Sequence, residues 1–174
     1  AATDTSQLCS ACAAGTYQAG EGATACVVCG AGFRCPEGSV VQIPASCDPG
    51  TYLDVTLDTC VGCPAGSMCV GGAAQPRPCS RGGVCAGNAP ESTDCPAGRY
   101  GSETGLSDAA CSGECAQGFY CPVGSMSAKA EACAEGTFGN ATGLVALANC
   151  STCPAGHACG LGASEPTRCV AATV

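Results

Sequence analysis

The sequence predicts an elongated rod of small disulfide-rich repeats, built from short β-hairpins and loops, with little regular secondary structure and almost no helix. Three observations carry this prediction: 20 of the 174 residues are cysteine, the cysteines recur at fixed spacings, and large apolar side chains are scarce. Cysteine at more than about a tenth of a chain marks a disulfide scaffold, and disulfides persist only where thiols are not kept reduced. We therefore expect an extracellular or cell-surface (secreted) protein.

The scarcity of large apolar side chains requires crosslinks in place of a core. Leu, Ile, Val and Phe together supply 23 residues, below the level at which an uncrosslinked chain can offset its conformational entropy by burial. A disulfide that closes a loop of about 15 residues contributes roughly 3 kcal/mol in the chain-entropy model. The 26 Gly and 11 Pro supply the turns that such loops demand.

One order of residues restarts along the chain. A full unit runs from a cysteine through a Gly-Thr-Tyr-like triplet, a pair of closely spaced cysteines and a five-residue spacer to the next unit. The expected units are residues 1–46 (a partial unit, then repeat 1 from Cys12), 47–78 (repeat 2), 79–94 (a half repeat), 95–132 (repeat 3) and 133–174 (repeat 4 and the start of the next unit). Incomplete units at both ends lead us to expect a longer array.

Within a unit we expect loops and two-stranded ribbons, because no segment holds the apolar period of a helix and alternating runs are short. The aromatic residue of the triplet is expected to cover a neighbouring disulfide, the alternative being an aromatic binding stripe. Four residues hold this position: Tyr17, Tyr52, Tyr100 and Phe138.

The charge of the chain excludes some partners. The formal net charge is -8 and only six residues are Lys or Arg, so there is no basic patch for nucleic acid. No stretch of about 18 apolar residues occurs, so we expect no membrane span in this segment. The expected partners are other copies of the chain or neighbouring repeats of a longer chain.

Three motifs resemble the cysteine-rich repeats of the ephrin-receptor-like type, which are relatives of the tumour necrosis factor receptor and EGF-like modules. They are Cys-Pro-Ala-Gly-x-Tyr from Cys95, Cys-x-x-Cys-Pro-Ala-Gly from Cys60 and Cys150, and Cys-Pro-x-Gly-Ser from Cys35 and Cys121. The similarity extends from Cys9 to Cys169, although Gly30 and Asp48 replace the usual proline. It implies an extracellular module and does not choose among receptors, adhesion proteins and long surface proteins.

Two disulfide schemes are compatible with the spacings, and both include the pair Cys12 to Cys26, which encloses one Gly-Thr-Tyr loop. The first is nested, with the pairs Cys35–Cys47, Cys69–Cys79, Cys85–Cys95, Cys121–Cys133 and Cys159–Cys169 inside Cys29–Cys60, Cys63–Cys111 and Cys115–Cys150, leaving Cys9 and Cys153. The second closes each five-residue spacer, as in Cys29–Cys35, and each triplet loop, as in Cys47–Cys60, leaving Cys9 and Cys169. We favour the nested scheme, because a longer loop closes with less strain.

The residues give no support for catalysis, for a metal or for a cofactor. The motif Cys-x-x-Cys at Cys26, Cys60 and Cys150 returns in successive units, whereas a redox site would occur once, before a helix. Zinc would require a reducing compartment. His157 is the single histidine, and it has no acid or nucleophile at a recurring position. We expect that the protein is not an enzyme.

Two N-glycosylation sequons are present, Asn140-Ala-Thr and Asn149-Cys-Ser, and Asn140 is the better acceptor because a cysteine that must be oxidised follows Asn149. The function we expect is a structural or interaction role, with the rod acting as a stalk, spacer or filament subunit at a cell surface. The alternative is a ligand-binding ectodomain module of a cell-surface receptor.

Overall fold

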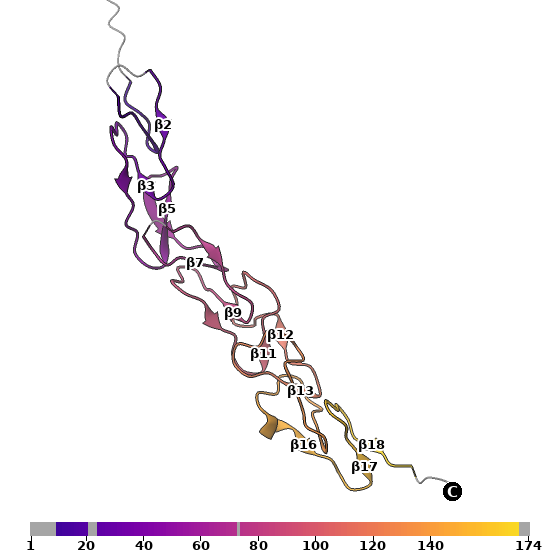
Figure 1. Cartoon of the computed structure of the whole chain (residues 1–174). Helices are drawn as coiled ribbons and strands as arrows, with labels where there is room; N and C mark the ends of the chain where they lie inside the picture. Colours follow the sequence, from indigo (N-terminus) through magenta and orange to yellow (C-terminus); the bar gives the residue numbers. More distant parts are fainter. Residues whose placement is uncertain (1–9, 21–23, 73, 171–174) are drawn as a thin grey trace, which may run out of the picture.

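The protein is a long rod in which the chain advances from one end to the other (Figure 1). The computed structural model describes residues 10–20, 24–72 and 74–170. Every strand pairs antiparallel with its neighbour in the sequence, so the described residues form nine two-stranded sheets and no larger one. The prediction of a rod of short hairpins is confirmed.

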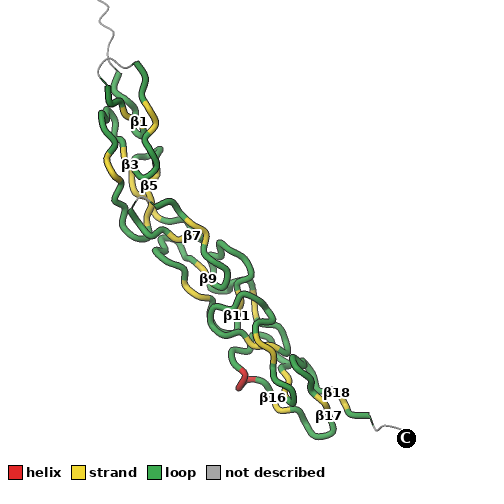
Figure 2. Tube along the Cα trace, viewed as in Figure 1, coloured by secondary structure: helices red, strands yellow, loops and turns green. Residues whose placement is uncertain are grey.

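We number the hairpins 1 to 9 in chain order. Their strands are β1 (Thr16–Tyr17) with β2 (Val27–Val28), β3 (Phe33–Arg34) with β4 (Ile43–Pro44), β5 (Thr51–Asp54) with β6 (Thr59–Gly62), β7 (Ser67–Met68) with β8 (Arg77–Pro78), β9 (Gly83–Val84) with β10 (Thr93–Asp94), β11 (Arg99–Tyr100) with β12 (Gly113–Glu114), β13 (Phe119–Tyr120) with β14 (Glu131–Ala132), β15 (Thr137–Phe138) with β16 (Ser151–Thr152), and β17 (His157–Ala158) with β18 (Thr167–Arg168). Loops make up most of the rod, and a single turn of 3-10 helix, Leu147–Asn149, is its one helical element among the described residues (Figure 2).

Each hairpin contains one disulfide, of one of two kinds. Hairpins 1, 3, 6 and 8 have long disulfides, which join Cys12 to Cys26, Cys47 to Cys60, Cys95 to Cys111 and Cys133 to Cys150. Hairpins 2, 4, 5, 7 and 9 have short disulfides, which join Cys29 to Cys35, Cys63 to Cys69, Cys79 to Cys85, Cys115 to Cys121 and Cys153 to Cys159. The two kinds alternate except at residues 79–94, which add hairpin 5 directly after another short hairpin.

The nested pairing favoured from the sequence is wrong. The structure contains none of the pairs Cys35–Cys47, Cys69–Cys79, Cys85–Cys95, Cys121–Cys133, Cys159–Cys169, Cys29–Cys60, Cys63–Cys111 and Cys115–Cys150. Cys153, expected to lack a local partner, is bonded to Cys159. Cys169 is an exposed free thiol, and Cys9 lies outside the described residues.

The short spacers close because each one contains a tight turn. A Cys-x-x-Gly segment opens every hairpin. In hairpin 6, for example, the N–H of Arg99 donates to the carbonyl of Pro96, and Gly98 between them has φ 86°. This is a type II turn, which requires the left-handed region and therefore favours glycine. The turn holds the Cα atoms of the short disulfides 5.8 to 6.1 Å apart, within the usual range for a disulfide.

Sulfur fills the interior of the rod. Among the described residues, 13 of the 16 buried apolar residues are cysteine, and the others are Ala45, Leu53 and Val84. In four of the five short disulfides both cysteines are buried, whereas each long disulfide has one buried cysteine and one that is exposed or half-buried. The short disulfides therefore form the inner line of the rod, and the long ones reach its surface.

Candidate functional site: the junctions between hairpins

Neighbouring hairpins are joined by a pair of backbone hydrogen bonds that recurs along the rod. At the junction of hairpins 6 and 7, the N–H of the turn glycine Gly98 donates to the carbonyl of Cys121 (2.8 Å). In return, the N–H of Gly124 in the loop of hairpin 7 donates to the carbonyl of Cys95 (2.9 Å). Because the bonds join backbone atoms, they tolerate changes of side chain from unit to unit.

Seven of the eight junctions have this pair of bonds. The loop residues that donate back are Gly38, Gly72, Asn88, Gly105, Gly124, Gly143 and Gly162. All have positive φ, between 63° and 79°, which explains why six are glycine and the seventh is asparagine. We call these the loop residues.

Six of the nine turn glycines are also covered by the hairpin two positions further along. A Cβ at Gly98 of hairpin 6 would lie 2.5 Å from the carbonyl oxygen of Gly143 in hairpin 8, closer than real Cβ atoms approach. The same arrangement places the carbonyls of Val55, Asn88, Gly105, Gly124 and Gly162 over Gly15, Gly50, Gly66, Gly82 and Gly118. These six hairpins thus contact the next two, which resists bending between units.

The turn glycines of the last two hairpins are open. Gly136 and Gly156 are exposed, and a Cβ at either would meet nothing within 4 Å. Their φ of 79° is nevertheless that of the covered turns. The turn conformation therefore comes from the hairpin itself and does not need the covering carbonyl.

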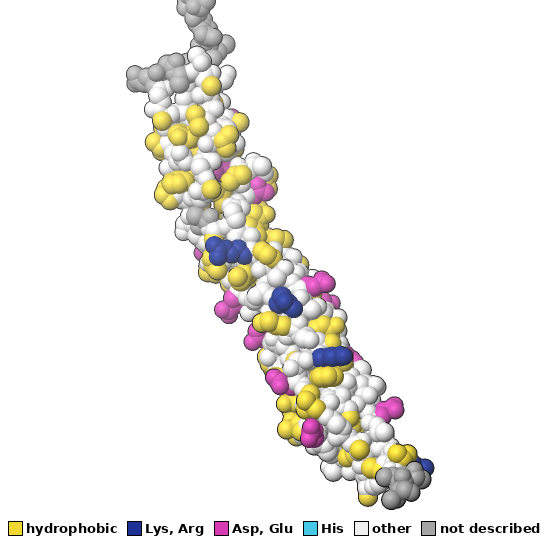
Figure 3. Space-filling view, turned by 45° about the vertical axis from the view of Figure 1, so that its right-hand side comes forward, with side chains coloured by type: hydrophobic (Ala, Val, Ile, Leu, Met, Phe, Trp, Pro, Cys, Tyr) yellow, Lys and Arg dark blue, Asp and Glu magenta, His cyan; other side chains and the backbone are white. Residues whose placement is uncertain are grey.

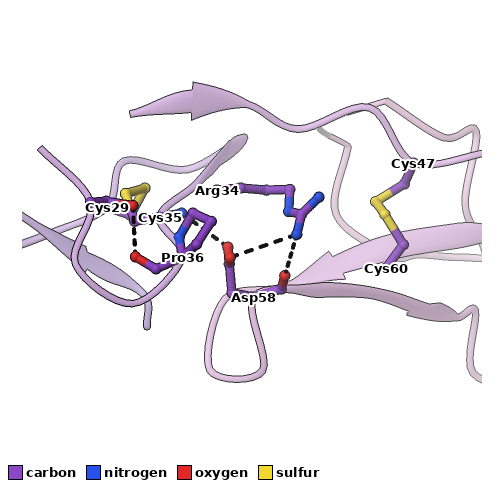
Figure 4. A network of polar contacts seen from close by, with 8 residues as sticks. Cys29, Arg34, Cys35, Pro36, Cys47, Asp58 and Cys60 are labelled. Carbon is purple, nitrogen blue, oxygen red and sulfur yellow. Dashed lines mark hydrogen bonds and ion pairs between the residues drawn. A yellow bond between two sulfur atoms is a disulfide. The ribbon is translucent and has the colours of Figure 1, made fainter. Parts of the chain in front are cut away.

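The junction between hairpins 2 and 3 is built differently, from side chains (Figure 4). The N–H of Cys35 donates to the carboxylate Oδ1 of Asp58 (2.9 Å). The Arg34 guanidinium donates to the backbone carbonyl of Asp58 (3.0 Å) and lies 3.7 Å from the carboxylate Oδ2 of the same residue. Asp58 is 8% exposed. In hairpin 4, by contrast, the N–H of Cys69 donates to the backbone carbonyl of Ala89. A carboxylate therefore takes the place of a backbone carbonyl at this one junction.

Replacing Asp58 with alanine is expected to loosen the junction between hairpins 2 and 3. The change leaves the buried N–H of Cys35 without an acceptor, which costs about 1–3 kcal/mol, and removes the partner of Arg34. Asp58→Asn is the matched control, because it keeps the oxygen and the tolerance for positive φ while removing the charge. Amide hydrogen exchange at Cys35 should become much faster in Asp58→Ala and only slightly faster in Asp58→Asn. An equal acceleration in both variants would show that the charge of Asp58 matters more than its oxygen acceptor.

The loop that covers the first turn glycine is organised by Asp54. Its Oδ1 accepts hydrogen bonds from the hydroxyl and the N–H of Thr56 (2.5 and 2.8 Å) and from the N–H of Leu57 (3.3 Å). These hydrogen bonds lower the pKa of the Asp54 carboxyl, and the bond from the Thr56 hydroxyl has the largest effect. The ionised Asp54 carboxylate therefore stabilises the loop at any pH above the ordinary pKa of aspartate. This stabilisation is lost as the pH falls through the lowered pKa of Asp54 in the folded protein.

The structure separates the cysteines that the sequence places close together. Within each Cys-x-x-Cys motif the two residues belong to different hairpins: Cys26 is bonded to Cys12, whereas Cys29 is bonded to Cys35. His157 lies half-buried on β17, and its Nδ1 is 3.3 Å from the Ala155 carbonyl. Among residues 10–20, 24–72 and 74–170, no group of three or more His, Cys, Asp or Glu side chains is placed to hold a metal ion.

The two sequons lie in the loop of hairpin 8, and both asparagines are exposed. The Asn140 carbonyl accepts a hydrogen bond from Gln117 (2.9 Å), and the Thr142 hydroxyl donates to Glu114 (2.6 Å). The side chain of Asn149 instead accepts a hydrogen bond from the N–H of Ala146 (3.1 Å) at the 3-10 turn. The Asn140 side chain is thus the freer of the two.

The four aromatic residues of the triplets stand on the first strands of the long hairpins, at Tyr17, Tyr52, Tyr100 and Phe138, and all are half-buried. In the part of the chain that the structure describes, no helix has the length and apolar character needed to cross a bilayer.

Comparison with known proteins identifies the first two hairpins. Residues 1–47 match the family model described as tyrosine-protein kinase ephrin type A/B receptor-like. No curated protein sequence matches the chain. Cysteine-rich repeats of this family are typically non-catalytic, and disulfide-rich repeats of this type are consistent with an extracellular module and suggest an extracellular location.

Proposed function

We propose that this chain, whose residues 1–47 form an ephrin-receptor-like cysteine-rich domain, is an extracellular rod that acts as a stalk, spacer or filament subunit at a cell surface. One observation carries the proposal: the same backbone junction recurs at seven of the eight contacts between successive hairpins, and six of the nine turn glycines are covered by the hairpin two positions further along. Such a structure holds its two ends at a fixed distance from each other.

Because the junction repeats, the number of hairpins in the sequence sets the length of the rod. In a one-dimensional array each unit contacts only near neighbours, so a unit can be added or removed without disturbing the rest. Hairpin 5 supports this, because residues 79–94 break the alternation of long and short disulfides yet keep both junction bonds. The N–H of Gly82 donates to the carbonyl of Gly101 in hairpin 6 (2.8 Å), and the N–H of Gly105 donates back to the carbonyl of Cys79 (2.9 Å).

Deleting residues 79–94 is expected to shorten the rod by about one ninth while preserving eight hairpins. The deletion keeps nine residues between Cys69 and the next cysteine, so Cys95 takes the place of Cys79 at the carbonyl of Gly66. Small-angle scattering measures the length, and peptide mapping without reduction reports the disulfides. A duplication of residues 79–94 is the matched control and should lengthen the rod equally.

The same variants test the spacer role on cells. With an anchor at one end of the chain and an epitope at the other, the height of the epitope above the membrane should fall and rise in step with the deletion and the duplication. A height that ignores both changes, or a deletion that scrambles the disulfides, contradicts the proposal.

We also propose an N-linked glycan at Asn140. The asparagine is exposed on a loop whose backbone is held by Gln117, and a glycan there would compensate for a surface with few charges. In material secreted from eukaryotic cells, mass spectrometry should find the glycan at Asn140 and lose it in Asn140→Gln, whereas Asn149→Gln should change the mass little. An unmodified Asn140 in such material contradicts this assignment.

A further inference from the structure

Three of the short hairpins, 4, 5 and 7, join the hairpin that follows them through the same three backbone groups. In hairpin 7, the N–H groups of Gly118 and Cys121 donate to carbonyls of hairpin 8 (2.7 and 2.9 Å). The carbonyl of Cys115 accepts in return from the N–H of Gly143 (2.9 Å). A complete junction of this kind therefore uses two donors and one acceptor of the preceding hairpin.

Hairpin 9 has the same three groups, and they are unpaired. In the described part of the chain, the N–H groups of Gly156 and Cys159 have no acceptor and the carbonyl of Cys153 has no donor. Cys159 is nevertheless only 8% exposed, and backbone groups near a protein interior are nearly always paired. Cys153 is half-buried, whereas the first cysteine of each of the other eight hairpins is buried. We call these three residues the open junction.

The turn glycine of the open junction also lacks a covering carbonyl. Five of the six covered turn glycines are buried, whereas Gly156 is exposed. In hairpin 7, the loop residue Gly124 places its carbonyl over Gly82 of hairpin 5. Gly38 is the corresponding loop residue of hairpin 2 and has nearly the same φ (78° against 76°), but no described hairpin lies two positions before it. An uncovered glycine at one end of the rod is thus matched by a carbonyl with no glycine to cover at the other end.

The order of the hairpins makes hairpin 1 the fitting continuation of hairpin 9. A long hairpin follows each short one except where hairpin 5 follows hairpin 4, and hairpin 9 is short whereas hairpin 1 is long. The rod already contains two backbone junctions of a short hairpin with a long one, hairpin 5 with 6 and hairpin 7 with 8. The chain's own sequence departs from the motif at this point, because Cys169 is followed by Val-Ala-Ala, whereas Cys-x-x-Gly opens each of the nine hairpins.

We propose that the open junction binds the N-terminal end of a second copy of this chain, with hairpin 1 of that copy following hairpin 9 and the Gly38 carbonyl of that copy lying over Gly156. Contact between two different surfaces at opposite ends does not close on itself, so it builds a filament of rods. This inference rests on the proposed function and deepens it by naming the partner of the filament. One junction is a small contact, so association is expected to be weak in solution and stronger where copies are held close together.

Charge does not oppose this contact. Among the described residues, hairpin 9 has one acidic and one basic residue, Glu165 and Arg168, and hairpins 1 and 2 have Glu37 and Arg34. Figure 3 shows acidic and basic side chains interspersed along the middle of the rod. The net charge of -8 lies mostly between the two ends, so it repels a copy that approaches from the side more than one that approaches end to end.

Sedimentation velocity of the intact chain tests the proposal, with Gly156→Asn as the blocking variant. Asparagine tolerates the φ of 79° at this position and meets open space in the single rod, but its Cβ would overlap the Gly38 carbonyl of a second copy. Wild-type masses should rise past that of a dimer as the concentration approaches about 1 mM, and Gly156→Asn should weaken association by roughly tenfold or more. Every chain has Cys169→Ser, so that the exposed free thiol cannot join copies covalently.

Gly72→Asn is the matched control. Gly72 has a φ of 64°, a Cβ there also meets nothing within 4 Å, and the residue belongs to hairpin 4, away from both ends. Asn88 holds the corresponding position of hairpin 5, so this variant should fold and associate as the wild type does, with disulfide maps confirming the fold of both variants. A small fraction of Gly156→Asn should also shorten wild-type filaments, because each variant copy can join an open junction but offers none itself, whereas Gly72→Asn should not.

Amide hydrogen exchange locates the contact. The amides of Gly156 and Cys159 should exchange more slowly as the wild-type concentration rises, and in Gly156→Asn the amide of Cys159 should not. A monomer at every concentration up to about 1 mM, a mass that stops at a dimer, or unchanged association in Gly156→Asn would each overturn the inference. The rod function is tested separately by scattering from monomeric Gly156→Asn, whose length should be that of one rod.

Discussion

Full reduction of the disulfides is expected to unfold the whole rod at room temperature. In the chain-entropy model each short disulfide contributes about 2 kcal/mol and each long one about 3 kcal/mol. Their sum exceeds the 5–15 kcal/mol by which ordinary domains are stable. The remaining core cannot compensate, because in the part of the chain that the structure describes only Ala45, Leu53 and Val84 are buried apolar residues other than cysteine.

Circular dichroism and amide dispersion in NMR spectra, recorded with and without a phosphine reductant, measure the loss of structure. At low reductant, trapping with iodoacetamide should label the long disulfides first, because Cys26 and Cys60 are exposed whereas Cys63 and Cys69 of a short disulfide are buried. A fully reduced chain that keeps dispersed amide signals would show that the backbone junctions suffice by themselves.

The second large effect is expected from Gly118→Ala, which should destabilise far more than Gly136→Ala. Both glycines occupy the same turn position with nearly equal φ, 80° and 79°, so an alanine suffers the same backbone strain of about 1–2 kcal/mol at either site. At Gly118 the new methyl group would also overlap the Gly162 carbonyl, whereas at Gly136 it meets open space. We expect a further cost of about 2 kcal/mol or more at Gly118 from this overlap.

Hydrogen exchange separates the two contributions, because the overlap acts between hairpins 7 and 9 and the strain acts within one hairpin. Gly118→Ala should raise exchange in both hairpins 7 and 9, and Gly136→Ala in hairpin 8 alone. Equal destabilisation by the two variants would mean that the covering carbonyl moves aside freely, and the stiffness of the rod would then have to come from the disulfides.

The sequence was sufficient for the class of fold because composition and cysteine spacing are local properties. The sequence was insufficient for the pairing of the cysteines, because the length of the closed loop was taken as the measure of strain. What makes the six-residue closure of Cys29 to Cys35 favourable is the turn that the following Gly32 adopts at φ 84°. The recurring Cys-x-x-Gly segment was the available signal, and it appears at the start of every hairpin.

The junctions were beyond sequence analysis for a different reason. Most of their bonds join backbone atoms, which every residue type possesses, so no side-chain pattern marks them. Arg34 and Asp58 do carry recognisable charges, but they are 24 residues apart and on different hairpins. Whether a turn glycine is open or covered depends on the hairpin two positions further along, and that contact exists only in the folded rod.

The closed loop within each hairpin also determines how the protein responds to mechanical tension. A pulling force applied to the two ends must pass through every disulfide, and the residues between bonded cysteines, 17 positions from Cys133 to Cys150 for instance, cannot be drawn out while the sulfur bridge is intact. Each freed residue would add about 3.5 Å of contour length. The oxidised protein can therefore lengthen under tension only through the segments outside the closed loops, such as residues 36–46, and reduction of its disulfides would release the enclosed residues as well.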